Sequence, residues 1–180
     1  MKFTNSLIKG KLLKRYKRFF ADIKVNNKII TAHCPNTGSM QGLLDKGNEV
    51  LVTEHNDPKR KLKFTLEIIK ANKRYVGVNT HRANKIVNHG LENKLISELK
   101  TIKNIKPEFK FSDDTRFDFL CDDNLIEVKN VTLFRENDID QIYFENYKKA
   151  KKAGVKFLAY RCKLSSKEIK IEKKINIIDE

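Results

Sequence analysis

The chain has 180 residues, of which 39% are hydrophobic, and its 38 basic and 23 acidic side chains give a formal net charge of +15. This length allows one domain or two small ones, and the apolar content argues against wholesale disorder. No apolar run is long enough to cross a membrane, the first 20 residues lack a signal-peptide pattern, and the three cysteines form neither a metal nor a disulfide pattern. We therefore expect a cytoplasmic protein.

The excess positive charge is concentrated in the first half of the chain. Residues 1–80 hold 17 basic and 6 acidic residues, a net charge of +11, whereas residues 81–180 hold 21 and 17, a net charge of +4. A basic first half favours a polyanionic partner, and nucleic acid is favoured over a membrane because no amphipathic anchor is visible. The alternative is that a Lys-rich composition only solvates the surface.

The first 80 residues are predicted to form short β-strands. Residues 19–25 and 28–34 flank Asn26–Asn27, a pair that is typical of hairpin turns. Further alternating segments follow at residues 48–55, 61–69 and 74–80. Several short strands at this spacing indicate a small barrel or sandwich.

Beyond residue 80 the sequence predicts helices and strands together. Residues 80–102 have apolar side chains at helical spacing, with Gly90 as the expected break between two helices. Strands are expected at 109–111, 116–120, 125–133, 155–162 and 169–178, and an amphipathic helix at 141–155 with Gly154 at its end. We therefore expect an all-β domain at residues 1–80 and a mixed α/β domain at residues 81–180.

The stretch LIEVKNVTL, residues 125–133, places charged residues inside an apolar strand. In an antiparallel hairpin across the turn CDDN, Asp118 lies opposite Glu127, and Lys129 shares their face. Opposed carboxylates destabilise a sheet, and a divalent cation would remove the conflict. This arrangement indicates half of a metal-dependent hydrolytic site, in which Lys129 orients a water or stabilises charge on a phosphate. The alternative is the solvent face of an ordinary edge strand, and a register slip of one residue would break the pairing.

Several stretches resemble the sugar fermentation stimulation protein family, in the family's order and within residues 7–133. They are LIKGKLLKRYKRFFADI, AHCPNTGSM, NDPKRKLKFTLE, VGVNT with Asn84 following, and RFDFL with IEVKNVTL. The resemblance implies a mixed α+β chain, with an OB-like N-terminal β-barrel followed by an α/β PD-(D/E)xK nuclease-like domain. It implies a DNA-binding protein with a regulatory role in sugar (maltose) metabolism, acting on DNA non-specifically or with weak specificity.

Two other functions remain as alternatives. One is a Mg²⁺- or Mn²⁺-dependent nuclease that hydrolyses phosphodiester bonds. The other is a structural or RNA-associated basic protein that carries a relic of the site, although RNA is the less favoured partner.

Carried over position by position, Asp118, Glu127 and Lys129 match the family's D…ExK signature and are the implied catalytic residues. Glu108 matches the acidic residue that completes the metal site with Asp118 and Glu127, although an exposed glutamate beside a proline is the alternative. After Leu133 the sequence departs from the family, because several tens of residues, including a helix and a strand, are missing. The helix and strand expected at 141–160 would take their place.

Two basic clusters are predicted to contact nucleic acid. The first, in KLLKRYKRFF, contains Lys14, Arg15, Lys17 and Arg18, interleaved with Tyr16, Phe19 and Phe20. The second, Lys59, Arg60 and Lys61, follows Pro58 in a predicted loop. Basic groups neutralise phosphates while aromatic rings stack on bases, although the aromatic residues fit a core equally well.

The segment HCPNTGSM, residues 33–40, combines His, Cys and small polar residues. His33 and Cys34 are adjacent, so in a strand they point to opposite faces and do not form a catalytic dyad. A tight turn stabilised by Asn, Thr and Ser side chains is favoured, and exposed amides that hold a phosphate are the alternative.

Overall fold

The structure is a computed structural model that describes residues 1–72, 74–130, 132, 160–164 and 169–174. The chain divides into two compact units, one of Lys2–Asn79 with Val131–Glu180 and the other of Thr80–Asn130 with Met1. The expected domain division at residue 80 stays a prediction. No helix in the described part of the chain is long and apolar enough to cross a membrane.

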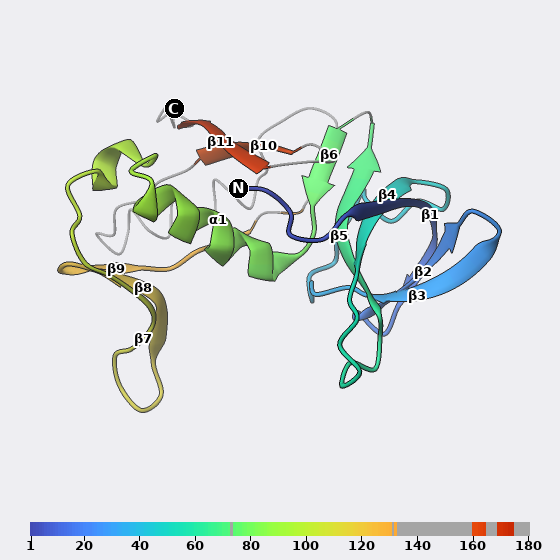
Figure 1. Ribbon diagram of the computed structural model, residues 1–180, viewed down its shortest axis with the longest axis horizontal. Helices are drawn as coiled ribbons and strands as arrows, with labels where there is room; N and C mark the ends of the chain where they lie inside the picture. Colours follow the sequence, from blue (N-terminus) through green and yellow to red (C-terminus); the bar gives the residue numbers. More distant parts are fainter. Residues whose placement is uncertain (73, 131, 133–159, 165–168, 175–180) are drawn as a thin grey trace. The chain divides into compact units, whose positions relative to one another are not determined.

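Five strands of the first unit close into a barrel, and a sixth extends its sheet (Figure 1). They are β1 (Leu7–Tyr16), β2 (Phe20–Val25), β3 (Lys28–His33), β4 (Glu49–Glu54), β5 (Phe64–Ala71) and β6 (Arg74–Gly77). The sheet order is β3-β2-β1-β4-β5-β6, and a parallel pairing of β3 with β5 closes the ring. This is the Greek-key arrangement of an OB-fold, so the predicted OB-like barrel is confirmed, as is the turn at Asn26–Asn27.

The barrel is filled by apolar side chains, which alternate with more exposed residues in part of β1 and in β2, whereas β4 and β5 contain runs of consecutive buried residues. Its fully buried members include Leu12, Ile23, Val50, Val52, Leu66 and Ile69. The strand β1 was not predicted from the sequence, because Gly10 occupies a buried position at which an alternating strand would carry an apolar side chain. Lys9 and Lys11 are exposed, whereas Gly10 between them and Leu12 after them are buried.

At Gly10 the strand β1 lies close against β2. A Cβ atom at this position would lie 2.5 Å from Cγ2 of Ile23 and 3.0 Å from the carbonyl oxygen of Lys24. Such contacts are too short for packed atoms, so the strands would have to separate before any larger residue could be accommodated.

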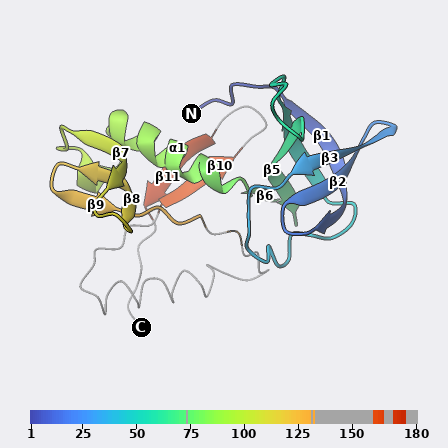
Figure 2. The same cartoon turned by 90° about the horizontal axis from the view of Figure 1, so that it is seen from below.

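The unit Thr80–Asn130 combines helices with a three-stranded antiparallel sheet (Figure 2). It contains α1 (Thr80–Glu92), the 3-10 helix η1 (Ser97–Leu99), β7 (Ile105–Lys110), β8 (Arg116–Cys121) and β9 (Asn124–Ile126). The sheet order is β7-β8-β9, and Phe119 of β8 is buried. The mixed α+β class is therefore confirmed.

The expected helix break at Gly90 is wrong. Gly90 is buried inside α1, which continues to Glu92. The chain leaves the helix at Lys94, whose φ of +54° is left-handed backbone. Packing of the small glycine inside the unit thus outweighs its weak helix propensity.

The hairpin of β8 and β9 has the predicted register with a shorter turn. Phe119 pairs with Ile126 and Leu120 with Leu125. Cys121 also pairs with Asn124, so the turn consists of Asp122 and Asp123 alone rather than of four residues. The Asp122 carboxylate accepts hydrogen bonds from the backbone amides of Asn104 and Lys103, and these bonds lower its pKa.

The expected strand 125–133 is wrong in its extent, because β9 ends at Ile126. The amide of Val128 donates to Oδ2 of Asp118 at 2.6 Å instead of continuing the backbone ladder. The other carboxylate oxygen of Asp118 accepts from Nδ2 of Asn84 in α1 at 2.6 Å. Asp118 therefore ties the end of the hairpin to the helix.

The described part of the C-terminal region holds one antiparallel strand pair, β10 (Tyr160–Leu164) and β11 (Ile169–Lys174). These strands overlap the predicted strands at 155–162 and 169–178. The helix predicted at 141–155 lies outside the described residues.

We expect Gly10→Ala to destabilise the protein by about 1–3 kcal/mol, because the added methyl group overpacks the contact between β1 and β2. The free energy of unfolding in urea measures this change. Lys11→Ala, at the neighbouring exposed position, is the control and should stay within about 0.5 kcal/mol of the parent. Equal stability of Gly10→Ala and the parent would contradict the close approach of the two strands.

We expect Asp118→Asn to destabilise the Thr80–Asn130 unit by about 1–3 kcal/mol, because an amide has one acceptor oxygen for two donors. Urea unfolding measures the loss, and amide hydrogen exchange at Val128 should become faster. Asp123→Asn, at the exposed turn of the same hairpin, should change neither quantity. Unaltered exchange at Val128 in Asp118→Asn would show that the carboxylate does not hold this amide.

Candidate nucleic-acid interface and acidic hairpin

The turn between β1 and β2 carries the first basic cluster. Tyr16 pairs with Phe20, so Lys17, Arg18 and Phe19 form a three-residue tip. All three side chains are exposed, and Phe19 is 44% accessible. Lys17 and Arg18 adopt left-handed backbone with φ values of +46° and +62°. The tip therefore presents two cations and one aromatic ring to solvent.

Arg15 clamps this tip to the loop that follows β3. Its guanidinium donates to the carbonyl oxygen of Arg18 at 2.9 Å and to that of Asn36 at 2.7 Å. The amide of Cys34 also donates to the carbonyl oxygen of Phe19 at 2.7 Å. These three hydrogen bonds connect the tip to Arg15 of β1 and to the loop that follows β3.

The other side chains of the first cluster interact within the hairpin. Nζ of Lys14 lies 3.5 Å from the Asp22 carboxylate and 5.2 Å from the ring centre of Tyr16. The rings of Tyr16 and Phe20 stack with centres 5.5 Å apart. Of the three aromatic residues, Phe19 is thus the one that faces solvent.

The segment 33–40 bends around the buried side chain of Asn36, one of the three polar residue types expected to stabilise a turn there. Its Oδ1 accepts from the amide of Gly38 at 2.9 Å, and its Nδ2 donates to the carbonyl oxygen of Val78 at 3.2 Å. Cys34 is fully buried, and this burial raises the pKa of its thiol. The segment therefore has a structural role in supporting the tip.

The connection between β4 and β5 carries the second basic cluster. Oδ1 of Asp57 accepts from the amide of Lys59 at 2.9 Å and starts a turn. Arg60 donates to Oγ1 of Thr65 at 2.8 Å, which anchors the end of the connection to β5. Lys59 and Lys61 are left exposed.

The two basic clusters lie near each other on neighbouring strands of the barrel. Phe20, next to the tip, pairs with His33, and His33 pairs with Thr65, which holds Arg60. Two strand spacings separate Phe20 from Thr65, a distance of about 10 Å. Segments about 40 residues apart in the sequence therefore form one basic surface, which we call the basic rim: Lys17, Arg18, Phe19, Lys59, Arg60 and Lys61.

Two of the three predicted acidic site residues are ion-paired with a basic side chain. Glu127 is ion-paired with Lys129, two residues further along the chain. Glu108 lies 3.6 Å from the guanidinium of Arg116. In the described residues no three His, Cys, Asp or Glu side chains gather closely enough to hold a metal ion, so Glu108, Asp118 and Glu127 do not form such a group here. Their assignment as metal ligands stays a prediction.

The donor chemistry of Asp118 and Glu127 fits a hard cation such as Mg²⁺ or Mn²⁺, because both residues supply carboxylate oxygens. Each oxygen of Asp118 accepts one hydrogen bond and keeps a lone pair. Asn84, which the resemblance places after the VGVNT stretch without giving it a role, is the group that orients Asp118. No local sequence signal identifies such a partner, because helix and strand meet only in the folded unit.

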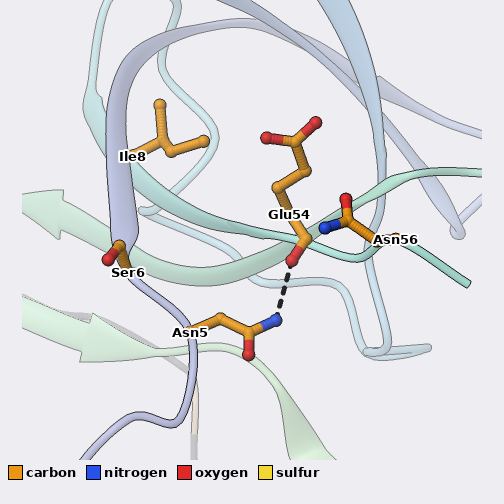
Figure 3. Close-up of a pocket in the computed structure, with 5 residues that line it drawn as sticks. All are labelled: Asn5, Ser6, Ile8, Glu54 and Asn56. Carbon is orange, nitrogen blue, oxygen red and sulfur yellow. Dashed lines mark hydrogen bonds between the residues drawn. The ribbon is translucent and has the colours of Figure 1, made fainter.

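A separate open hollow of about 470 Å³ lies where β1 begins and β4 ends (Figure 3). It is lined by Asn5, Ser6, Ile8, Glu54 and Asn56. Nδ2 of Asn5 donates to the carbonyl oxygen of Glu54 at 2.7 Å. Since the only charged group of this lining is a carboxylate, the hollow is unsuited to a phosphate.

Two family models match the chain. The first, described as SfsA N-terminal OB domain, matches residues 13–78. The second, described as Sugar fermentation stimulation protein RE domain, matches residues 81–139. These ranges contain the basic rim and the segment from Arg116 to Lys129, which carries Asp118 and Glu127 and which we call the acidic hairpin.

Similar proteins include several named sugar fermentation stimulation protein homolog. The one from Pelagibacter ubique (strain HTCC1062) is 52% identical over 231 positions, which cover 99% of this chain and 100% of the relative. The one from Geobacter sulfurreducens is 30% identical and covers 96% of both chains. The match to the Alteromonas mediterranea relative, 43% identical, covers 74% of this chain and 61% of the relative.

The Pelagibacter alignment leaves positions of the relative without a counterpart in this chain. Its 231 positions exceed the 180 residues of this chain by 51, so at least 51 positions of the relative have no counterpart here. This size agrees with the several tens of residues expected to be missing after Leu133.

Among solved structures, that of Pyrococcus furiosus SfsA in complex with Ca²⁺ is similar, with a TM-score of 0.59 and 22% sequence identity. The match covers 67% of this chain and 51% of that chain, and it shows a shared fold. From the two family models and the identity to full-length relatives, the chain belongs to the sugar fermentation stimulation protein family.

Proposed function

We propose that this protein binds DNA through the basic rim. The observation that carries the proposal is the pairing of Phe20, His33 and Thr65, which sets two basic loops side by side on an OB barrel. OB-folds commonly use these two loops, between the first two strands and between the last two, for oligonucleotides. The net charge of +11 on residues 1–80 attracts a polyanion to the same half of the chain.

The exposed cations of the rim supply affinity rather than sequence recognition. Lys17, Arg18, Lys59 and Lys61 neutralise phosphates, a contact that is the same for every base sequence. Arg15 positions the tip through two carbonyl oxygens. We therefore propose non-specific or weakly specific binding to DNA in the cytoplasm, with DNA favoured over RNA.

The name of the relatives connects the family with sugar fermentation. We extend this connection to the present chain as a regulatory role in sugar (maltose) metabolism, exerted through DNA binding.

A second candidate function is Mg²⁺- or Mn²⁺-dependent cleavage of DNA. It is favoured by the hairpin register, which brings Asp118 beside the residues that follow Ile126, and by the Ca²⁺ in the Pyrococcus furiosus relative. A bound cation would make a water molecule more acidic and stabilise charge on the scissile phosphate. Asp118 and Glu127 would hold it, with Asp118 oriented by Asn84, and Lys129 would place its ammonium beside the phosphate.

We expect the double variants Lys17→Ala/Arg18→Ala and Lys59→Ala/Lys61→Ala to bind duplex DNA more weakly than the parent. Each variant should lower the slope of log affinity against log salt by about 1.8, because two phosphate contacts are lost. Fluorescence anisotropy over a salt series measures the slope. The matched control is Lys24→Ala/Lys28→Ala, which removes two exposed lysines on and beside the β2–β3 turn. A control that loses as much as the rim variants would refute a localised interface.

Labelled DNA incubated with the protein and Mn²⁺ or Mg²⁺ distinguishes the two candidate functions. For the leading proposal we expect intact DNA on a denaturing gel and a salt-sensitive shift on a native gel. Fragments that disappear with EDTA and with Glu127→Ala would instead establish the second candidate. Cleavage that persists in Glu127→Ala would exclude the acidic hairpin as its source.

A further inference from the structure

We propose that Phe19 stacks on an unpaired base, so that the basic rim prefers single-stranded DNA to duplex DNA. This inference rests on the proposed function and specifies the form of its substrate. It begins from an exposed aromatic ring whose two stacked neighbours, Tyr16 and Phe20, pack against each other.

The position of Phe19 is suited to a base-stacking contact. The ring follows Lys17 and Arg18 directly and is 44% accessible at a hairpin tip. Cations that hold the backbone of a strand beside an aromatic ring are the usual elements of single-strand binding. The exposed part of this large apolar ring does not stabilise the free protein, because it stays in contact with water.

The backbone of the tip is already fixed by hydrogen bonds in the free protein. The carbonyl oxygen of Phe19 accepts from the amide of Cys34, and that of Arg18 accepts from Arg15. Arg15 lies in β1, and Cys34, directly after β3, is fully buried. Little backbone entropy is therefore lost on binding, which favours affinity.

A duplex offers no equivalent surface to the ring. Its base faces are covered by neighbouring pairs, and inserting a side chain between them costs a few kcal/mol of unstacking. In a single strand the faces are open, and each stacked base contributes without regard to sequence. The phosphate contacts of the rim serve both forms, so the preference comes from Phe19.

The chain contains another exposed apolar residue that serves as a matched control. Ile29 is 68% accessible and lies in the β2–β3 hairpin next to the exposed Lys28. It shares the apolar and basic surroundings of Phe19 without an aromatic face. A general hydrophobic or charge effect would involve both positions, whereas base stacking involves Phe19 alone.

The first test compares oligo(dT) of about 16 nucleotides, the upper range for one OB-fold, with a duplex of equal length at fixed salt. We expect Phe19→Ala and Phe19→Leu to weaken oligo(dT) binding by about 5- to 150-fold, the loss of one stacked base, and to leave duplex binding within about twofold. Phe19→Tyr should retain the parent affinity, and so should Ile29→Ala. Equal losses on both forms, or no loss on either, would overturn the inference and leave the proposed function standing.

The second test uses the fact that the chain contains no tryptophan. Phe19→Trp introduces a single indole, whose fluorescence we expect to be quenched by oligo(dT) and far less by duplex. Ile29→Trp should respond to neither. An unquenched Trp at position 19 in a complex that anisotropy shows to be formed would refute stacking. A parent protein that binds neither form would refute the proposed function itself, and this inference with it.

Discussion

The short parallel pairing of β3 with β5 is the contact on which the proposed interface depends. It joins Ala32 to Phe64 and His33 to Thr65 and so converts an open sheet into a closed barrel. Closure pairs the end of β3 with the start of β5, where both strands would otherwise offer unpaired backbone groups. The same two residue pairs bring the β1–β2 turn beside the β4–β5 connection. The electrostatic surface is thus a product of backbone geometry, and neither loop alone would create it.

The basic residues of the first cluster divide into two kinds that charge counting does not separate. Arg15 uses its guanidinium on backbone carbonyl oxygens, and Lys14 lies beside Asp22 and Tyr16. Lys17 and Arg18 extend into solvent from the tip. Residues that shape a surface and residues that contact a ligand can therefore be adjacent in sequence and identical in charge. The acidic hairpin follows the same rule, since Asp118 is a structural acceptor as well as a candidate ligand.

The sequence predicts most strongly those features that depend on neighbouring residues. The Asn26–Asn27 turn, the barrel strands β2 to β6 and the pairing of Phe119 with Ile126 follow from local alternation and turn chemistry. The features that it missed depend on contacts across the fold. The strand β1 was missed because Gly10 has no apolar side chain, and only the fold shows that it lies against Ile23. Gly90 stays helical because it is buried. Strand β9 ends because the next amide available for pairing, that of Val128, donates to the side chain of Asp118.

The left-handed backbone at Lys17 and Arg18 makes the tip a point of local frustration. Two consecutive residues with a Cβ atom occupy a region that disfavours each by about 1–2 kcal/mol, whereas Gly and Asn enter it more readily. Lys and Arg thus disfavour the backbone conformation of the tip. The hydrogen bonds from Arg15 and from the amide of Cys34 hold the backbone in that conformation. A relaxed backbone and a positively charged tip are therefore alternatives at these two positions, because the residues that enter the left-handed region most readily carry no positive charge.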